Sequence, residues 1–105
     1  MAEFQGRWRI VWMAEWDEDF IDLIAPGYFH FADDLGEFAF GAVTGAIDAR
    51  YTEGGRRVDF SWEGHDEGDD VSGRGWLCLI DEETAEGRLF IHLGDDSAIR
   101  LKRQA

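Results

Sequence analysis

The chain has 105 residues, 45% of them hydrophobic and 14% aromatic, which is enough to bury the core of one domain spanning residues 1–105. Asp and Glu number 23 against 10 Lys and Arg, and the formal net charge of −13 argues against nucleic acids and anionic membranes as partners. The single cysteine, Cys78, excludes an intrachain disulfide framework and a zinc site built from several cysteines.

The first predicted element is a β-strand at residues 7–12. Trp8, Ile10 and Trp12 alternate with arginines, and a period of two is typical of a strand with one buried and one solvated face. The same alternation recurs in seven later segments, which predicts eight strands in all. These segments are residues 28–31, 37–40, 47–51, 57–63, 76–80, 88–93 and 99–102.

Residues 14–24 break the alternation and predict a short helix after the first strand. Their apolar side chains fall at i, i+4, i+7 and i+8, the spacing of one helix face: Trp16, Phe20, Leu23 and Ile24. Asp17–Asp19 bring negative charge to the first turn, which the helix dipole favours, and Pro26-Gly27 would end the helix. The alternative is a strand that continues through residues 20–24.

Short turns connect the predicted strands. Asp33–Gly36 and Glu53–Arg56 have the composition of hairpin turns, and Gly41 and Gly45 flank either a third turn or a kink. Sequential strands without helical crossovers form an up-and-down antiparallel sheet, and closing that sheet removes its two exposed edges. We therefore predict an all-β fold, a small closed eight-stranded antiparallel barrel with one short helix.

The inner face of this barrel is predicted to be rich in aromatic side chains, with Cys78 on the same face as Trp76. Eight strands leave an interior that side chains just fill or that holds one small ligand. The face is therefore either a solid core or a pocket for a planar or aliphatic molecule, with Tyr51 and Cys78 as its polar features. The candidate pocket residues are Trp8, Phe20, Phe40, Tyr51, Phe60, Trp62, Trp76 and Cys78.

Half of the basic residues lie in the first and last predicted strands. The four that would face outward along one seam, if these strands pair, are Arg7, Arg9, Arg100 and Lys102. Like charges that face each other across a ladder are unfavourable. Either carboxylates such as Glu3 or those of Asp17–Asp19 neutralise them, or the seam docks an acidic partner, including the acidic face of a second copy.

Residues 63–70 concentrate five carboxylates and His65 in one predicted loop. Such a loop either holds a hard cation through oxygen ligands or is a solvated acidic turn, and its spacing does not match an EF-hand. His30 and His92 fall on outer strand faces, and the pattern does not bring together a nucleophile, a base and oxyanion donors. We therefore assign no catalytic, metal or cofactor site and do not expect an enzyme.

The two ends of the chain resemble a known barrel family. Gly6-Arg7-Trp8, together with Arg100 in the last strand, is similar to the calycin signature of lipocalins and fatty-acid-binding proteins, in which an arginine from the final strand covers a G-x-W tryptophan. The segment after the first strand resembles the helical plug of the fatty-acid-binding branch. The resemblance implies a calycin-like barrel with room for an apolar ligand.

Longer stretches resemble a group of short bacterial proteins of unassigned function, which implies a bacterial cytosolic protein. They are residues 6–11, 19–23, 38–45, 60–64 and 91–97. The N-terminal sequence Met-Ala-Glu-Phe-Gln-Gly-Arg lacks the order of a signal peptide, and no stretch reaches the ~20 apolar residues of a transmembrane helix. We therefore expect a cytoplasmic protein.

The leading functional hypothesis is a non-enzymatic β-barrel that binds a small apolar or aromatic ligand, gated by residues 14–24, or the surface of a protein partner. The alternative is an acidic interaction or regulatory module that docks a basic partner, because a net charge of −13 attracts cationic proteins. A homo-oligomer is compatible with either hypothesis.

Overall fold

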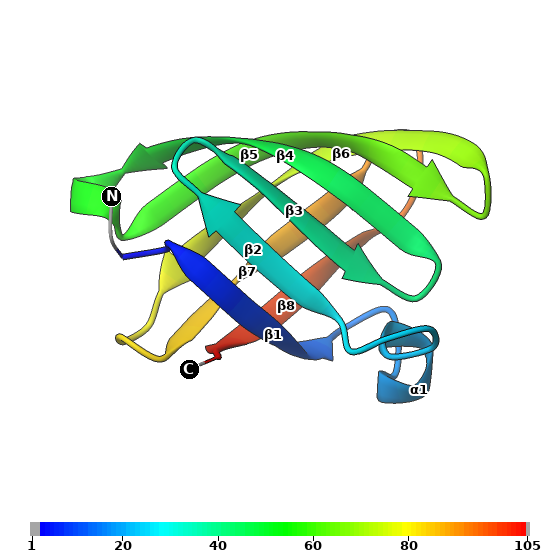
Figure 1. Cartoon of the computed structure of the whole chain (residues 1–105), viewed down its shortest axis with the longest axis horizontal. Helices are drawn as coiled ribbons and strands as arrows, with labels where there is room; N and C mark the ends of the chain where they lie inside the picture. The colour runs from blue at the N-terminus through cyan, green and yellow to red at the C-terminus, as the bar shows by residue number, and fades with distance from the viewer. Residues whose placement is uncertain (1–2, 105) are drawn as a thin grey trace.

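The protein is a closed barrel of eight antiparallel strands in this computed structural model, which describes residues 3–104 (Figure 1). The strands are β1 (Gly6–Met13), β2 (Tyr28–Ala32), β3 (Leu35–Phe40), β4 (Val43–Thr52), β5 (Arg57–Asp66), β6 (Asp69–Leu79), β7 (Thr84–Ile91) and β8 (Asp96–Arg103). Each strand pairs with the next, and β1 also pairs with β8, so the predicted up-and-down barrel is confirmed. Met1 and Ala2, the first two residues of the N-terminal sequence that lacks the order of a signal peptide, and Ala105 lie outside the described residues.

Aromatic rings fill the interior, because alternation along each strand turns every second side chain inward. The ring centroid of Phe38 lies 5.0 Å from that of Phe29 and 4.9 Å from that of Trp62. Phe60 lies 5.9 Å from Phe29, edge to face, an arrangement that favours aromatic pairs. The buried aromatic residues are Phe4, Trp8, Phe29, Phe31, Phe38, Phe40, Phe60 and Trp62.

Strand β6 faces the core with the opposite alternation to the one predicted. Leu77 is fully buried, whereas Trp76 and Cys78 lie on the outer face, so their predicted inward placement is wrong. The physical reason is the packing of Phe60. Its ring lies against Gly75, which is on the same strand face as Leu77, and a Cβ on Gly75 would come within 2.5 Å of that ring. A strand with apolar side chains on both faces gives no alternation from which to choose its inner face.

A β-bulge in β1 turns Trp12 out of the core. The pairing of β1 with β8 shifts between Ile10 and Trp12, so Val11 is an extra residue. The shift reverses the alternation, which buries Met13 and leaves 43% of Trp12 exposed. The prediction that Trp12 shares the inner face of Trp8 is therefore wrong.

The predicted helix is present but spans a single turn, α1 (Glu18–Ile21). Asp17 caps it, since its Oδ1 accepts a hydrogen bond of 3.0 Å from the Phe20 N–H. Phe20 packs against the core, whereas Leu23 and Ile24, predicted for the same helix face, lie beyond the helix and are exposed. The alternative of a continued strand is wrong. No helix among residues 3–104 is long and apolar enough to cross a membrane.

Helix α1 lies at the end of the barrel where β2 begins and β3 turns into β4 (Figure 1). The Gly41 N–H donates a hydrogen bond of 2.8 Å to the Ile21 carbonyl oxygen. Gly41 has a φ of +55°, and a Cβ there would come within 2.5 Å of the Phe20 ring, so glycine allows α1 to approach. Gly41-Ala42 forms a full turn between the strands rather than a kink.

Two of the remaining predicted turns are present, and the predicted acidic loop is not. Asp33-Asp34 joins β2 to β3, and the 3₁₀ turn η1 (Glu53–Gly55) leads from β4 toward β5, both as predicted. Residues 63–70, predicted as an acidic loop, are instead the paired ends of β5 and β6, with only Glu67-Gly68 between the strands.

Candidate functional site

The eight candidate pocket residues divide between the inside and the outside of the barrel. The four that point into the filled interior are Trp8, Phe40, Phe60 and Trp62, each buried. Phe20 and Tyr51 are partly buried and pack against the core from its two ends. Trp76 and Cys78 lie outside, so the structure removes them from the candidate pocket.

The end of the barrel where β1 begins is closed by Phe4 and by polar groups around Tyr51. The Phe4 ring lies 5.8 Å from that of Trp8, and its carbonyl oxygen accepts a hydrogen bond of 3.0 Å from Trp8 Nε1. The Tyr51 hydroxyl donates to the Asp33 carbonyl oxygen (2.6 Å) and accepts from Gln5 Nε2 (3.1 Å). Burial is the main reason that the pKa of Tyr51 is raised. Phe4 precedes the first alternating segment, so no periodic signal marks it.

Arg103 covers Trp8 at this end. Its guanidinium carbon lies 4.2 Å from the centre of the Trp8 ring. Its Nη1 donates to the Gln5 carbonyl oxygen and its Nε to that of Glu82, both at 2.9 Å, and its other terminal nitrogen donates to the carbonyl of Glu3. This arginine therefore ties the last strand to the segment before β1.

Arg100, the arginine predicted to cover Trp8, lies over Trp12 instead, 5.1 Å from the ring centre. The pairing of β1 with β8 explains the correction, because Trp8 lies opposite Arg103 and Trp12 lies opposite Arg100. A sequence without a known register does not distinguish the two arginines.

The seam between β1 and β8 carries the predicted basic residues on its outer face, and neighbouring groups engage them. Arg9 forms an ion pair of 2.7 Å with Asp22. Arg7 lies 3.9 Å above the Tyr28 ring, while Lys102 is exposed opposite Arg9. Within residues 3–104, the carboxylate that pairs with the seam comes from Asp22 rather than from the acidic residues named in the prediction.

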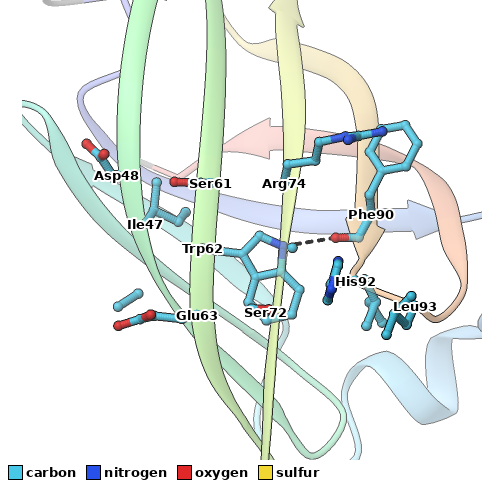
Figure 2. Close-up of a pocket in the computed structure, with 13 residues that line it drawn as sticks. Ile47, Asp48, Ser61, Trp62, Glu63, Ser72, Arg74, Phe90, His92 and Leu93 are labelled. Atoms are coloured by element: carbon cyan, nitrogen blue, oxygen red, sulfur yellow. Dashed lines mark hydrogen bonds between the residues drawn. The ribbon is translucent and has the colours of Figure 1, made fainter.

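The outer face of β4–β7 has a hollow of about 770 Å³ that is open to solvent (Figure 2). Figure 2 shows Asp48 and Glu63 on one side of it and Arg74 and His92 on the other. Asp48 is already paired with Arg50, and Arg74 offsets the charge of Glu63 across the hollow, so this hollow offers little net attraction to an ion of either sign.

Trp62 closes the barrel wall beneath this hollow. Its indole lies against Gly73, where a Cβ would come within 2.8 Å of Nε1. The same Nε1 donates a hydrogen bond of 3.2 Å to the Phe90 carbonyl oxygen, drawn as a dashed line in Figure 2. The hydrogen bond holds the ring in place and satisfies its one polar group.

A second hollow, of about 840 Å³ and also open to solvent, lies between β1 and α1. It arises because β2 pairs with β1 only over Gly6–Arg9, so the α1 segment, not a strand, lies beside the rest of β1. Its apolar lining includes Ile10, Val11, Trp12, Met13, Trp16 and Ile21. Its charged lining is Glu15, Asp17, Glu18, Asp22 and Arg9. The sequence did not predict this site, because the pattern does not show where β2 begins relative to β1.

Trp16 and Phe20 cover the end of the barrel next to this second hollow. The Trp16 ring lies 5.0 Å from that of Phe40, and the Phe20 ring lies 6.3 Å from it. The two rings also lie 6.1 Å from each other. The α1 segment therefore caps the aromatic core at this end.

In the acidic hairpin of β5 and β6, His65 Nδ1 lies 3.2 Å from Asp70 Oδ1, and both side chains are exposed. In the part of the chain that the structure describes, no group of three or more His, Cys, Asp and Glu side chains is placed to hold a metal ion. Cys78 Sγ lies 3.9 Å from Arg57 Nη1 on the outer face of the barrel.

Compared with known proteins, the chain matches no family model, no curated protein and no solved structure.

Proposed function

We propose that this protein is a non-enzymatic binding module that docks a basic protein partner on its outer surface. The filled interior is the observation that carries the proposal. The Phe38 ring lies within 5.0 Å of both Phe29 and Trp62, and removing a packed ring of this kind from a core costs about 3–5 kcal/mol. A ligand inside the barrel would have to displace such rings, whereas a partner on the surface would not.

Charge supports a basic partner. Residues 3–104 form four ion pairs between an arginine and a carboxylate, so most of the 23 acidic side chains of the sequence remain available to an incoming cation. The net charge of −13 also accelerates the approach of a cationic protein at low ionic strength.

A labelled peptide that alternates arginine with leucine tests this proposal by fluorescence anisotropy. The matched control is the same peptide with citrulline, the neutral analogue, in place of each arginine. We expect binding of the arginine peptide that weakens by about tenfold between low and physiological salt, because exposed charges are screened over a Debye length of about 8 Å. Equal binding of the citrulline peptide, or affinity that is independent of salt, would contradict the proposal.

A calycin-like barrel that holds a small apolar ligand is the second candidate, and the cover of Trp8 by Arg103 favours it. That contact places an arginine of the last strand on the G-x-W tryptophan, as the calycin resemblance implies. In this candidate function, Trp16 and Phe20 form the gate over Phe40. As part of this second candidate, we propose that the protein is bacterial and cytoplasmic, as its sequence resemblance implies.

A neutral naphthylamine dye, fluorescent only in apolar surroundings, separates the two candidates. Surface docking predicts no dye binding by the unmodified protein and binding by Phe38→Ala, because losing a central ring leaves a dry cavity. Saturable binding by the unmodified protein would favour the internal ligand if it is lost in Trp16→Glu, which places a charge at the proposed gate.

A further inference from the structure

The second half of β1 presents apolar side chains to solvent next to a hollow. The bulge leaves Val11 53% and Trp12 43% exposed. From them the hollow extends inward to Met13 and Ile21, which are buried in the core. Large apolar side chains at the edge of an open hollow are typical of an interaction surface.

Carboxylates surround this apolar lining. Glu15 and Glu18 are exposed and take part in none of the ion pairs of residues 3–104. Arg9 is the one basic residue in the described lining, and its charge is matched by Asp22 at 2.7 Å. Arg100 lies over Trp12 at the edge of the hollow and offsets one of the three remaining carboxylates, those of Glu15, Asp17 and Glu18. The hollow therefore carries net negative charge over an apolar floor, and the occupant that complements both is cationic and apolar.

We infer that the hollow between β1 and α1 is the docking site for an amphipathic basic segment of a partner protein. An apolar side chain of the segment packs on Val11 and Trp12, and flanking arginine or lysine side chains meet Glu15 and Glu18. This inference rests on the proposed function and names its site. The hollow of Figure 2 lacks the combination, because Arg74 lies opposite Glu63 and its other carboxylate, Asp48, is already paired with Arg50.

A second copy of the chain is a poorer occupant than a basic partner. Two molecules that each carry a net charge of −13 repel each other. Analytical ultracentrifugation of the unmodified protein and its variants reports the oligomeric state, because a dimer would offer another explanation for loss of peptide binding.

Two double variants with the same charge change locate the site. Glu15→Lys with Glu18→Lys reverses the rim, whereas Glu63→Lys with Asp69→Lys reverses two exposed carboxylates on the β5 and β6 strands. We expect the rim variant to weaken binding of the arginine–leucine peptide by about tenfold or more, and the matched variant by about two- to threefold, through the long-range field alone. Circular dichroism and thermal unfolding of both variants confirm that they fold.

A peptide with serine in place of each leucine tests the apolar part of the site. We expect it to bind about tenfold more weakly to the unmodified protein, because it buries less apolar area against Val11 and Trp12. Equal binding of the serine and leucine peptides, equal losses in the two double variants, or a dimer that the rim variant dissociates would each overturn the inference while leaving the proposed function standing. Failure of the unmodified protein to bind the arginine peptide would instead remove the proposed function.

Discussion

Each half of β1 contains a tryptophan that lies beneath an arginine, but the two tryptophans differ in how far they are exposed to solvent. Trp8 and Trp12 each lie beneath an arginine of β8, at 4.2 Å and 5.1 Å from the ring centre. Trp8 is fully buried, whereas Trp12 is 43% exposed. The first half of the strand, Gly6–Arg9, pairs with β2 on one side and with β8 on the other, and the second half faces α1 on the side that β2 leaves free.

The comparison shows that an arginine over a ring does not by itself make a core. Trp8 is buried because Phe4 covers it, because Arg103 bonds three backbone carbonyls around it, and because strands flank it on both sides. Trp12 has the arginine alone. Trp8 in the first half of β1 is therefore covered on all sides, whereas in the second half Trp12 lies at the surface beside the hollow.

Replacing each tryptophan by alanine is the strongest test of this difference. Trp8→Ala is expected to lower the free energy of unfolding by about 3–5 kcal/mol, because it leaves a cavity in a closed part of the core. Trp12→Ala is expected to lower it by about 1 kcal/mol or less, since the exposed ring loses mainly its contact with Arg100. Urea unfolding followed by circular dichroism measures both, and equal losses would remove the distinction between the two halves.

The two covering arginines provide the next test. Arg103→Ala is expected to destabilise the protein by about 2–3 kcal/mol, because hydrogen bonds from a charged donor to backbone carbonyls are among the stronger ones. Arg100→Ala removes one exposed cation–π contact and is expected to cost about 0.5–1 kcal/mol. Arg103→Lys keeps the charge but not the fork of donors. Recovery of full stability in Arg103→Lys would show that charge alone matters.

Alternation along the strands was enough to predict the barrel and most of its core. In β5, Val58, Phe60 and Trp62 alternate with polar residues without interruption, and all three are buried as predicted. Closure followed from the need to remove sheet edges, and the pairing of β1 with β8 confirms it.

The errors occur where alternation carries no information. β6 has apolar residues on both faces, so its inner face is set by the fit of Phe60 against Gly75, a contact between strands. The bulge at Val11 depends on the register of β1 and β8. The same register decides that Arg103, not Arg100, covers Trp8. The hollow beside β1 depends on where β2 begins, and this is likewise a property of the assembled sheet.

Removing the N-cap of α1 tests whether this helix, which lies beside the second half of β1, opens independently of the barrel. Asp17→Ala removes the acceptor for the Phe20 N–H and is expected to lower stability by about 1 kcal/mol. Asp19→Ala, in the same turn but without a capping bond, is expected to change it by less than about 0.5 kcal/mol. Hydrogen exchange should show faster opening at Phe20–Asp22 in Asp17→Ala, with the amides of β1–β8 pairing unchanged. Uniformly faster exchange across the barrel would instead make α1 part of the global fold.

The smallest expected effect is a loss of stability at alkaline pH, and it comes from the surroundings of the first half of β1. Both tyrosines of the sequence lie next to it: Tyr28 of β2 lies opposite Arg9 in the pairing of β1 with β2, and the Tyr51 ring of β4 lies 6.5 Å from that of Phe4. A hydrogen bond to Glu37 is the main reason that the pKa of Tyr28 is raised above its ordinary value of 10.0, and burial is the main reason for Tyr51.

Because the folded protein holds these two protons more tightly than the unfolded chain, their contribution to stability is fully present below pH 10 and is lost as the pH rises through the raised values. Absorbance at the tyrosinate band follows both groups directly, since the chain has no other tyrosine. We expect midpoints above 10 in the native protein and a return to the ordinary value in urea. Tyr28→Phe and Tyr51→Phe assign each midpoint, and the alkaline loss of stability should shrink in both. A native midpoint at or below the ordinary value would show, for Tyr28, that the hydrogen bond to Glu37 does not hold its proton and, for Tyr51, that burial does not.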